Sequence, residues 1–104
     1  MRPIDFARLK QLVPMHQVLD LISWRPLRRE NDELRGPCPV HLSTSPKSRC
    51  FAVKGNSWYC HGRCRHGGDQ VRLYAEVRGL LVYDAAVELC GELKIAVPYL
   101  ALRR

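Results

Sequence analysis

The chain has 104 residues, with 17 lysines and arginines against 10 aspartates and glutamates, and a formal net charge of +7. It has no apolar run near the roughly 20 residues that span a bilayer, and its first residues are too charged for a signal peptide. We therefore expect one small cytoplasmic domain that does not enter a membrane, and the positive charge predicts a polyanionic partner, nucleic acid first.

Two short helices are predicted near the N-terminus. The first covers about residues 5–13 with Asp5 as its N-cap, and Pro14 both interrupts it and opens the second. The second helix carries apolar residues at helical spacing, which predicts packing in the core. These residues are Met15, Val18, Leu19 and Ile22.

The central region is expected to form two hairpins. Residues 25–36 are charged and contain the turn-like ENDE at 30–33, which predicts two short strands joined by a turn. RCFAV at 49–53, KGNS at 54–57 and WYCH at 58–61 predict strand, turn and strand. Gly55 and Asn56 are the residues there that tolerate the positive φ of a tight turn.

Two further helices are expected to complete the domain. The glycines at 67–68 predict a sharp turn, after which Asp69 caps a helix that runs to about Arg78 and stops at Gly79. A final helix has one apolar face, formed by Ala86, Leu89, Cys90 and Leu93. We expect Pro98 to end regular structure and YLALRR to be a loosely attached tail, so that the domain covers residues 1–95 and the tail 96–104.

The five cysteines predict a metal site. Cys38 and His41 form a Cys-x2-His pair, and Cys60 and Cys64 form a Cys-x3-Cys pair. Ligands spaced in this way lie in turns that direct both donors toward one Zn²⁺. An odd number of cysteines and a reducing cytosol favour zinc over disulfides. Four protein ligands leave no open position, so we expect one structural Zn²⁺.

The remaining donors have alternative roles. His61 and His66 flank the second pair and could replace a ligand, although we expect them to face solvent or phosphate. Cys50 lies on a predicted strand and Cys90 on the apolar face of the last helix, and both are expected to be small buried hydrophobic residues.

Cations and aromatic rings alternate around the same pairs, which is typical of proteins that bind single-stranded nucleic acid. The cations expected to meet phosphates are Lys47, Arg49, Lys54, Arg63 and Arg65. Trp58 or Tyr59 is expected to stack on a base. Because neighbouring residues on a strand face opposite ways, we expect one ring of that pair to be exposed and the other to join Phe51 in the core.

The order of these motifs resembles the N-terminal zinc-binding domain of bacterial-type (DnaG-like) DNA primases. The similar segments are GPCPVH, SPKSRCFAV, WYCHGRC and GGDQVRLYAEVRGLLVYDAAVEL. The resemblance implies that Cys38 and His41 are the first ligand pair, and Cys60 and Cys64 the second. The family usually places two residues inside the second pair and a glycine after it. Here three residues intervene and an arginine follows, so His61 remains an alternative to Cys60, which we prefer because it follows directly from the strand.

The resemblance also implies a fold and a function. The fold is α+β, a zinc ribbon with a small antiparallel sheet of hairpins, flanked by short N- and C-terminal helices. The function is binding of single-stranded template DNA beside a separate primase catalytic domain or another replication protein. The chain shows no carboxylate cluster for catalytic metal ions, so we expect a monomeric recognition module that is not itself an enzyme. The alternative is a protein–protein docking module of a replication or mobile-element complex that uses the C-terminal helices and AVPYLAL.

Overall fold

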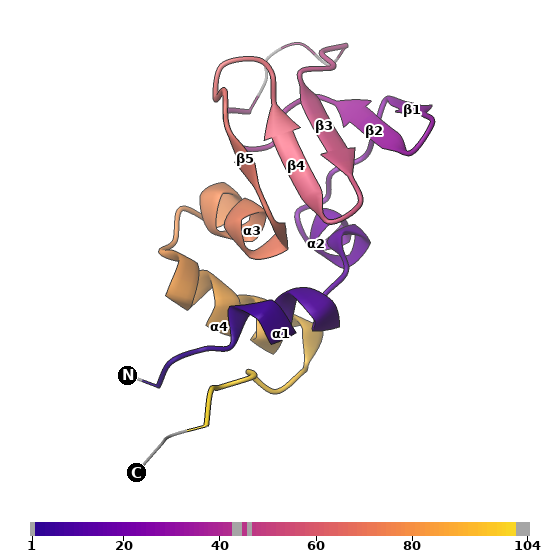
Figure 1. Ribbon diagram of the computed structural model, residues 1–104. Helices are drawn as coiled ribbons and strands as arrows, with labels where there is room; N and C mark the ends of the chain where they lie inside the picture. The colour runs from indigo at the N-terminus through magenta and orange to yellow at the C-terminus, as the bar shows by residue number, and fades with distance from the viewer. Residues whose placement is uncertain (1, 43–44, 46, 102–104) are drawn as a thin grey trace.

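The structure is a computed structural model, and it describes residues 2–42, 45 and 47–101 (Figure 1). Its elements in chain order are α1 (Phe6–Leu12), α2 (Met15–Leu21), β1 (Arg28–Glu30), β2 (Glu33–Gly36), β3 (Phe51–Lys54), β4 (Ser57–Cys60), β5 (Gly67–Gly68), α3 (Gln70–Arg78) and α4 (Val82–Leu93). The strands form one antiparallel sheet in the order β1-β2-β3-β4-β5, and the helices gather below it in Figure 1. The predicted α+β class is confirmed.

The two N-terminal helices begin where the sequence predicts. The Asp5 side chain accepts a hydrogen bond from the backbone N–H of Arg8 at 3.0 Å, which satisfies one of the unpaired donors of the first turn. Pro14 separates α1 from α2 and is the N-cap of α2. The apolar stripe is in the core, because Met15, Val18 and Leu19 are buried and Ile22 packs against them.

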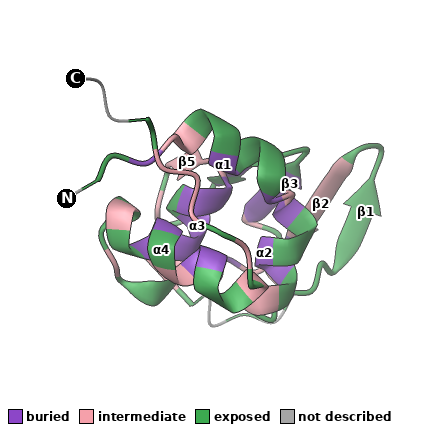
Figure 2. Cartoon of the chain, turned by 90° about the horizontal axis from the view of Figure 1, so that it is seen from below, coloured by how far each residue is buried: buried purple, intermediate pink, exposed green. Residues whose placement is uncertain are grey.

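The sheet has one face in the core and one face turned outward. Along β4 the exposure alternates, so that Trp58 and Cys60 are buried while Ser57 and Tyr59 are exposed. The register pairs Trp58 with Val53 of β3, and both belong to the same core cluster as the helices. Figure 2, which views the molecule from below, shows the buried residues on the sides of the helices that face one another. The helices therefore cover the face that carries Trp58.

The tip of the β3–β4 hairpin differs in one respect from the prediction. Gly55 has a φ of 58°, the conformation for which glycine is favoured, but Asn56 is not among the positive-φ residues of the described chain. Asn56 has another function, because its side-chain Oδ1 accepts the backbone N–H of Met15 at 3.1 Å. The asparagine thereby joins the hairpin tip to the start of α2.

The two glycines at 67–68 form a strand, where the sequence predicted only a turn. They make up β5, in which Gly68 lies opposite Trp58 and Gly67 lies opposite Tyr59. A Cβ atom added to Gly67 would lie 2.0 Å from the backbone oxygen of Trp58. The close pairing of β5 with β4 therefore requires a residue without a side chain at this position.

α3 ends where the sequence predicts, and α4 forms as the predicted final helix. Asp69 caps α3 by accepting the backbone N–H of Arg72 at 2.9 Å, and Gly79 ends the helix with a φ of 68°. On the predicted apolar face of α4, Ala86, Leu89 and Cys90 are buried and Leu93 packs against the core. None of the helices in the described ranges is both long enough and apolar enough to cross a membrane.

The segment after Pro98 is attached to the N-terminal segment, which differs from the loose tail that we expected. Tyr99 forms a β-bridge with Ile4, and the backbone N–H of Asp5 donates to the carbonyl of Pro98 at 2.7 Å. On the other side of the bridge, the backbone N–H of Leu100 donates to the carbonyl of Pro3 at 2.9 Å. The division at residue 95 stays a prediction, and residues 102–104 lie outside the described part.

Candidate metal centre

The four predicted ligands come from two turns at one end of the sheet. Cys38 and His41 lie in the turn that follows β2. Cys60 is the last residue of β4, and Cys64 lies in the turn that leads to β5. The backbone N–H of Cys60 donates to the carbonyl of His66 at 3.0 Å, which closes the second turn.

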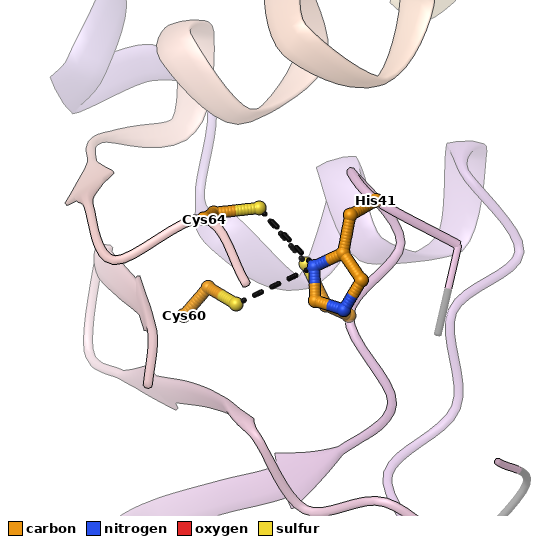
Figure 3. A group of neighbouring side chains, drawn as sticks. His41, Cys60 and Cys64 are labelled. Carbon is orange, nitrogen blue, oxygen red and sulfur yellow. Dashed lines mark hydrogen bonds between the residues drawn. The ribbon is translucent and has the colours of Figure 1, made fainter. Parts of the chain in front are cut away.

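The donor atoms converge to a geometry that suits zinc. All four lie within 4.8 Å of one another. The Cys38 and Cys64 sulfurs are 3.8 Å apart. Nδ1 of His41 lies 3.2 Å from the Cys64 sulfur and 3.6 Å from the Cys60 sulfur, and Figure 3 shows these three side chains turned toward one another. Tetrahedral Zn²⁺, with bonds of about 2.3 Å to sulfur and 2.0 Å to nitrogen, places its ligand atoms about 3.5–3.8 Å apart. The residues present therefore fit one zinc ion.

The thiols of this cluster need a cation to ionise together. Burial raises the pKa of Cys38 to about 12 and also raises the pKa of Cys64. Burial acts in the same direction on Cys60, but the backbone N–H groups of Cys64 and Gly62 and the neighbouring thiols together lower its pKa below the usual value. Three adjacent thiolates would repel one another in this buried position, whereas Zn²⁺ offsets their charge. All five cysteines of the chain are free of disulfides.

The two neighbouring histidines lie outside the cluster. His61 is exposed, and its ring centre lies 4.7 Å from that of Tyr59. The ring nitrogens of His66 are bonded to the Glu76 carboxylate at 2.5 Å and to the Cys64 carbonyl at 3.0 Å. The hydrogen bond to Glu76 and the one to the Cys64 carbonyl raise the pKa of His66. The salt bridge to Glu76 was not predicted, because a partner ten residues away on another element leaves no sequence pattern.

The remaining cysteines pack as small apolar residues, Cys90 fully buried and Cys50 half-buried. Cys50 lies directly beside the second metal turn, since a Cβ added to Gly62 would come within 2.9 Å of the Cys50 Cβ. Gly62 is therefore required where the Cys-x3-Cys turn passes β3, and sequence spacing alone did not indicate this requirement.

The predicted nucleic-acid residues separate into buried and exposed groups. Trp58 is 3% exposed and its ring N–H donates to the Asp69 carbonyl at 2.9 Å, so it is a core residue and cannot stack on a base. Phe51 is also fully buried, and its ring stacks on that of Trp58. Tyr59 is 41% exposed. The prediction that one ring of the Trp58/Tyr59 pair is exposed is confirmed, and that ring is Tyr59.

The predicted cations are all exposed, but they do not form a single cluster. Arg63 and Arg65 lie in the second metal turn, and Arg49 precedes β3 at the same end of the sheet. Lys54 lies at the opposite end of β3, and Lys47 lies in the loop between the first metal turn and β3.

Another arginine of the sheet was missed by sequence reasoning. Arg35 on β2 donates from two guanidinium nitrogens to the Arg49 carbonyl, at 2.9 and 2.7 Å. The register places Arg35 opposite Ala52 and Ala52 opposite Tyr59, so Arg35 and Tyr59 share the outward face. This contact was hidden in the sequence because it depends on pairing between β2 and β3.

Together, the antiparallel sheet and the converging Cys-His-Cys-Cys donors define a small zinc-ribbon domain with one structural zinc ion. The sequence model of the CHC2 zinc finger of DnaG primases matches residues 4–104, so the chain belongs to the CHC2 zinc finger family.

Similar curated proteins are the DNA primases of Rickettsia prowazekii (strain Madrid E) and Rickettsia typhi (strain ATCC VR-144 / Wilmington). Each is 28% identical to the chain over 80 residues, which are 75% of this chain and 13% of the primase. The chain thus corresponds to a small part of the length of these relatives. No solved structure is a significant match to the chain.

The assignment of the third ligand can be tested with two adjacent substitutions. Cys60→Ser should abolish stoichiometric zinc binding, because Cys60 is buried in the cluster, whereas His61→Ala should retain one zinc per chain, because His61 points away to Tyr59. Zinc is measured by atomic emission on purified protein, with the wild type as reference. Zinc retained in Cys60→Ser and lost in His61→Ala would show that His61 is the ligand.

Proposed function

We propose that this domain binds single-stranded DNA on the outward face of its sheet, held in shape by a zinc ion on Cys38, His41, Cys60 and Cys64. The observation that carries the proposal is the exposed Tyr59 ring on a sheet face that the helices leave uncovered. An aromatic ring on such a face can stack on any base, because every base has a π-face.

The charges beside Tyr59 support the proposal. The row of residues that contains Tyr59 continues through Ala52 to Arg35 and Arg28, because Arg28 is opposite Arg35 in the register. The two arginines also form ion pairs, with Glu30 and Glu33. Arg35 also fixes the backbone of Arg49, and thereby the end of the loop that carries Lys47. Cations that surround a stacking ring neutralise the phosphates of a strand whose bases face the protein.

The family supports a role beside an enzyme. The similar proteins are named DNA primases, and the match covers only a small part of each. We infer that the domain contributes template binding as a monomer, while primer synthesis belongs to a separate catalytic domain or another replication protein. The rival docking function is less well supported, because Pro98 to Leu100 of the AVPYLAL segment are already paired with the N-terminal segment.

A salt titration with two variants tests this proposal. Each cation that neutralises a phosphate of a single strand contributes about −0.7 to the slope of log K against log salt, so three or four contacts give roughly −2 to −3. Tyr59→Ala should weaken binding about 5- to 100-fold without changing that slope, because it removes stacking. Arg63→Ala should reduce the slope by about 0.7, because it removes one phosphate contact.

The measurement is fluorescence anisotropy of an unstructured labelled oligonucleotide, and Leu81→Ala is a suitable control. Leu81 is 77% exposed and is the N-cap of α4, a helix that Figure 1 shows away from the sheet. A folded, zinc-loaded wild type that binds no oligonucleotide at low salt would overturn the proposal. A different outcome would favour the docking function. In it the wild type binds no DNA but binds a protein partner, and Leu81→Ala loses that partner.

A further inference from the structure

The exposed Tyr59 ring has an aromatic neighbour. His61 comes two residues later, directly after the end of β4, and its side chain is also exposed. The centres of the two rings are 4.7 Å apart, and the ring planes are inclined at 57°. We call these two side chains the ring pair. Because alternate residues of an extended segment face the same way, the pair belongs to the outward face of the sheet.

The backbone that carries the ring pair is fixed on both sides. The backbone N–H of His61 donates to the carbonyl of Cys50 at 2.7 Å, which continues the β3–β4 pairing one residue beyond each strand. Cys60, between the two rings, is buried and belongs to the metal cluster. A surface that is already ordered loses little conformational entropy when it binds a ligand.

The spacing of the ring pair suits two consecutive bases. Stacked bases along one strand are about 3.4 Å apart. The ring centres of Tyr59 and His61 are 4.7 Å apart, so a slightly spread strand places neighbouring bases on neighbouring rings. The inclination of the two rings keeps them from stacking face to face on each other, which leaves ring surface for the bases.

The positions of the cations indicate the direction of the strand. β4 leads from Tyr59 through His61 into the second metal turn, where Arg63 and Arg65 are both exposed (Figure 1). Nε of Arg65 donates to the Gly62 carbonyl at 3.2 Å, and the other N–H groups of this guanidinium can still donate to a phosphate. A strand that follows β4 therefore meets a second ring and then cations, whereas the next residue across the sheet from Tyr59 is an alanine.

We propose that Tyr59 and His61 bind two consecutive bases of a single strand, one base on each ring, and that the strand runs along β4 toward the second metal turn. Every base has a π-face, so the ring pair requires adjacent bases without selecting their identity. The inference rests on the proposed binding of single-stranded DNA, to which it adds a second stacking residue and the path of the strand.

The test uses two strands that carry only two bases each. Both are short strands of abasic nucleotides with two thymines, which are adjacent in one strand and separated by several abasic nucleotides in the other. The strands have equal length and charge, so their phosphate contacts contribute equally. Fluorescence anisotropy should show that the wild type binds the adjacent strand at least about fivefold more tightly, because a second base stacks.

Two substitutions of His61 assign this preference to its ring. His61→Ala should bind the two strands with equal affinity, and His61→Phe should restore the preference, because phenylalanine again supplies a ring. His16→Ala is the matched control, since His16 is an exposed histidine of α2, and the preference should remain in this variant. The zinc content of each variant is measured first.

Three outcomes would overturn the ring-pair proposal while single-strand binding stands. They are a wild type without preference for adjacent bases, a preference that survives in His61→Ala, and a loss of zinc in His61→Ala, which would make His61 a metal ligand. A wild type that binds neither these strands nor an unmodified oligonucleotide would instead overturn the proposed function.

Discussion

Removal of the zinc ion by a strong chelator is expected to unfold the domain. Structural zinc sites contribute about 10 kcal/mol or more of apparent binding free energy, which is comparable to the whole unfolding free energy of a small domain. Cys38 and Cys60 are buried where the two metal turns meet. Removal of zinc therefore removes the ion that joins these thiols and the two turns that carry them. Circular dichroism should show loss of the cooperative melting transition as a metal indicator reports one released zinc.

The control for this experiment is the same chelator saturated with zinc before it is added. That sample should melt like the untreated protein, and addition of excess zinc to the chelated sample should restore the transition. A protein that has released its zinc yet keeps the same melting temperature would show that the metal is not structural.

Gly67→Ala is expected to destabilise the domain by about 3 kcal/mol or more. The new methyl group would meet the backbone oxygen of Trp58 at 2.0 Å and the Cα of Tyr59 at 3.0 Å. These are backbone atoms of the neighbouring strand, so the clash cannot be relieved by a side-chain rotation and must separate β5 from β4. Urea unfolding followed by circular dichroism measures the loss of unfolding free energy.

Gly91→Ala is the matched control. Gly91 lies within α4, and a Cβ added there meets no atom within 4 Å apart from the neighbouring backbone of the helix itself. Alanine should stabilise this helix by about 0.5–1 kcal/mol, because it favours helical backbone more than glycine does. Equal unfolding free energies for the Gly67 and Gly91 variants would contradict the close β4–β5 pairing.

The sequence predicted those features that depend on local chemistry. Asp5 and Asp69 both cap helices as expected, because an N-cap needs only a short acceptor side chain next to a helical segment. The spacing of Cys38, His41, Cys60 and Cys64 was sufficient to predict the convergence of their donor atoms, since turns of this length direct both ligands inward. The alternation of strand residues predicted one exposed ring in the Trp58/Tyr59 pair.

The features that depend on tertiary pairing were not visible in the sequence. β5 consists of two glycines, which have little strand propensity, and it exists because β4 offers backbone partners. Gln70 is completely buried, and its Nε2 donates to the carbonyls of Lys10 and Val13 at 2.9 Å each. The side-chain amide of Gln70 thus gives hydrogen-bond donors to backbone carbonyls at the end of α1, although Gln70 lies on α3, sixty residues from Lys10 in the sequence. Its position just after the N-cap of α3 gave no sign of burial.

The bridge between Ile4 and Tyr99 also has a kinetic consequence. It joins segments separated by almost the whole chain, at the end of the molecule opposite the metal turns (Figure 1). A contact of such high sequence separation closes a long loop, so we expect it to form late in folding and to open early in local fluctuations. Tension applied to the two ends of the domain would therefore separate this bridge first, while the hairpins and the zinc cluster at the far end remain intact.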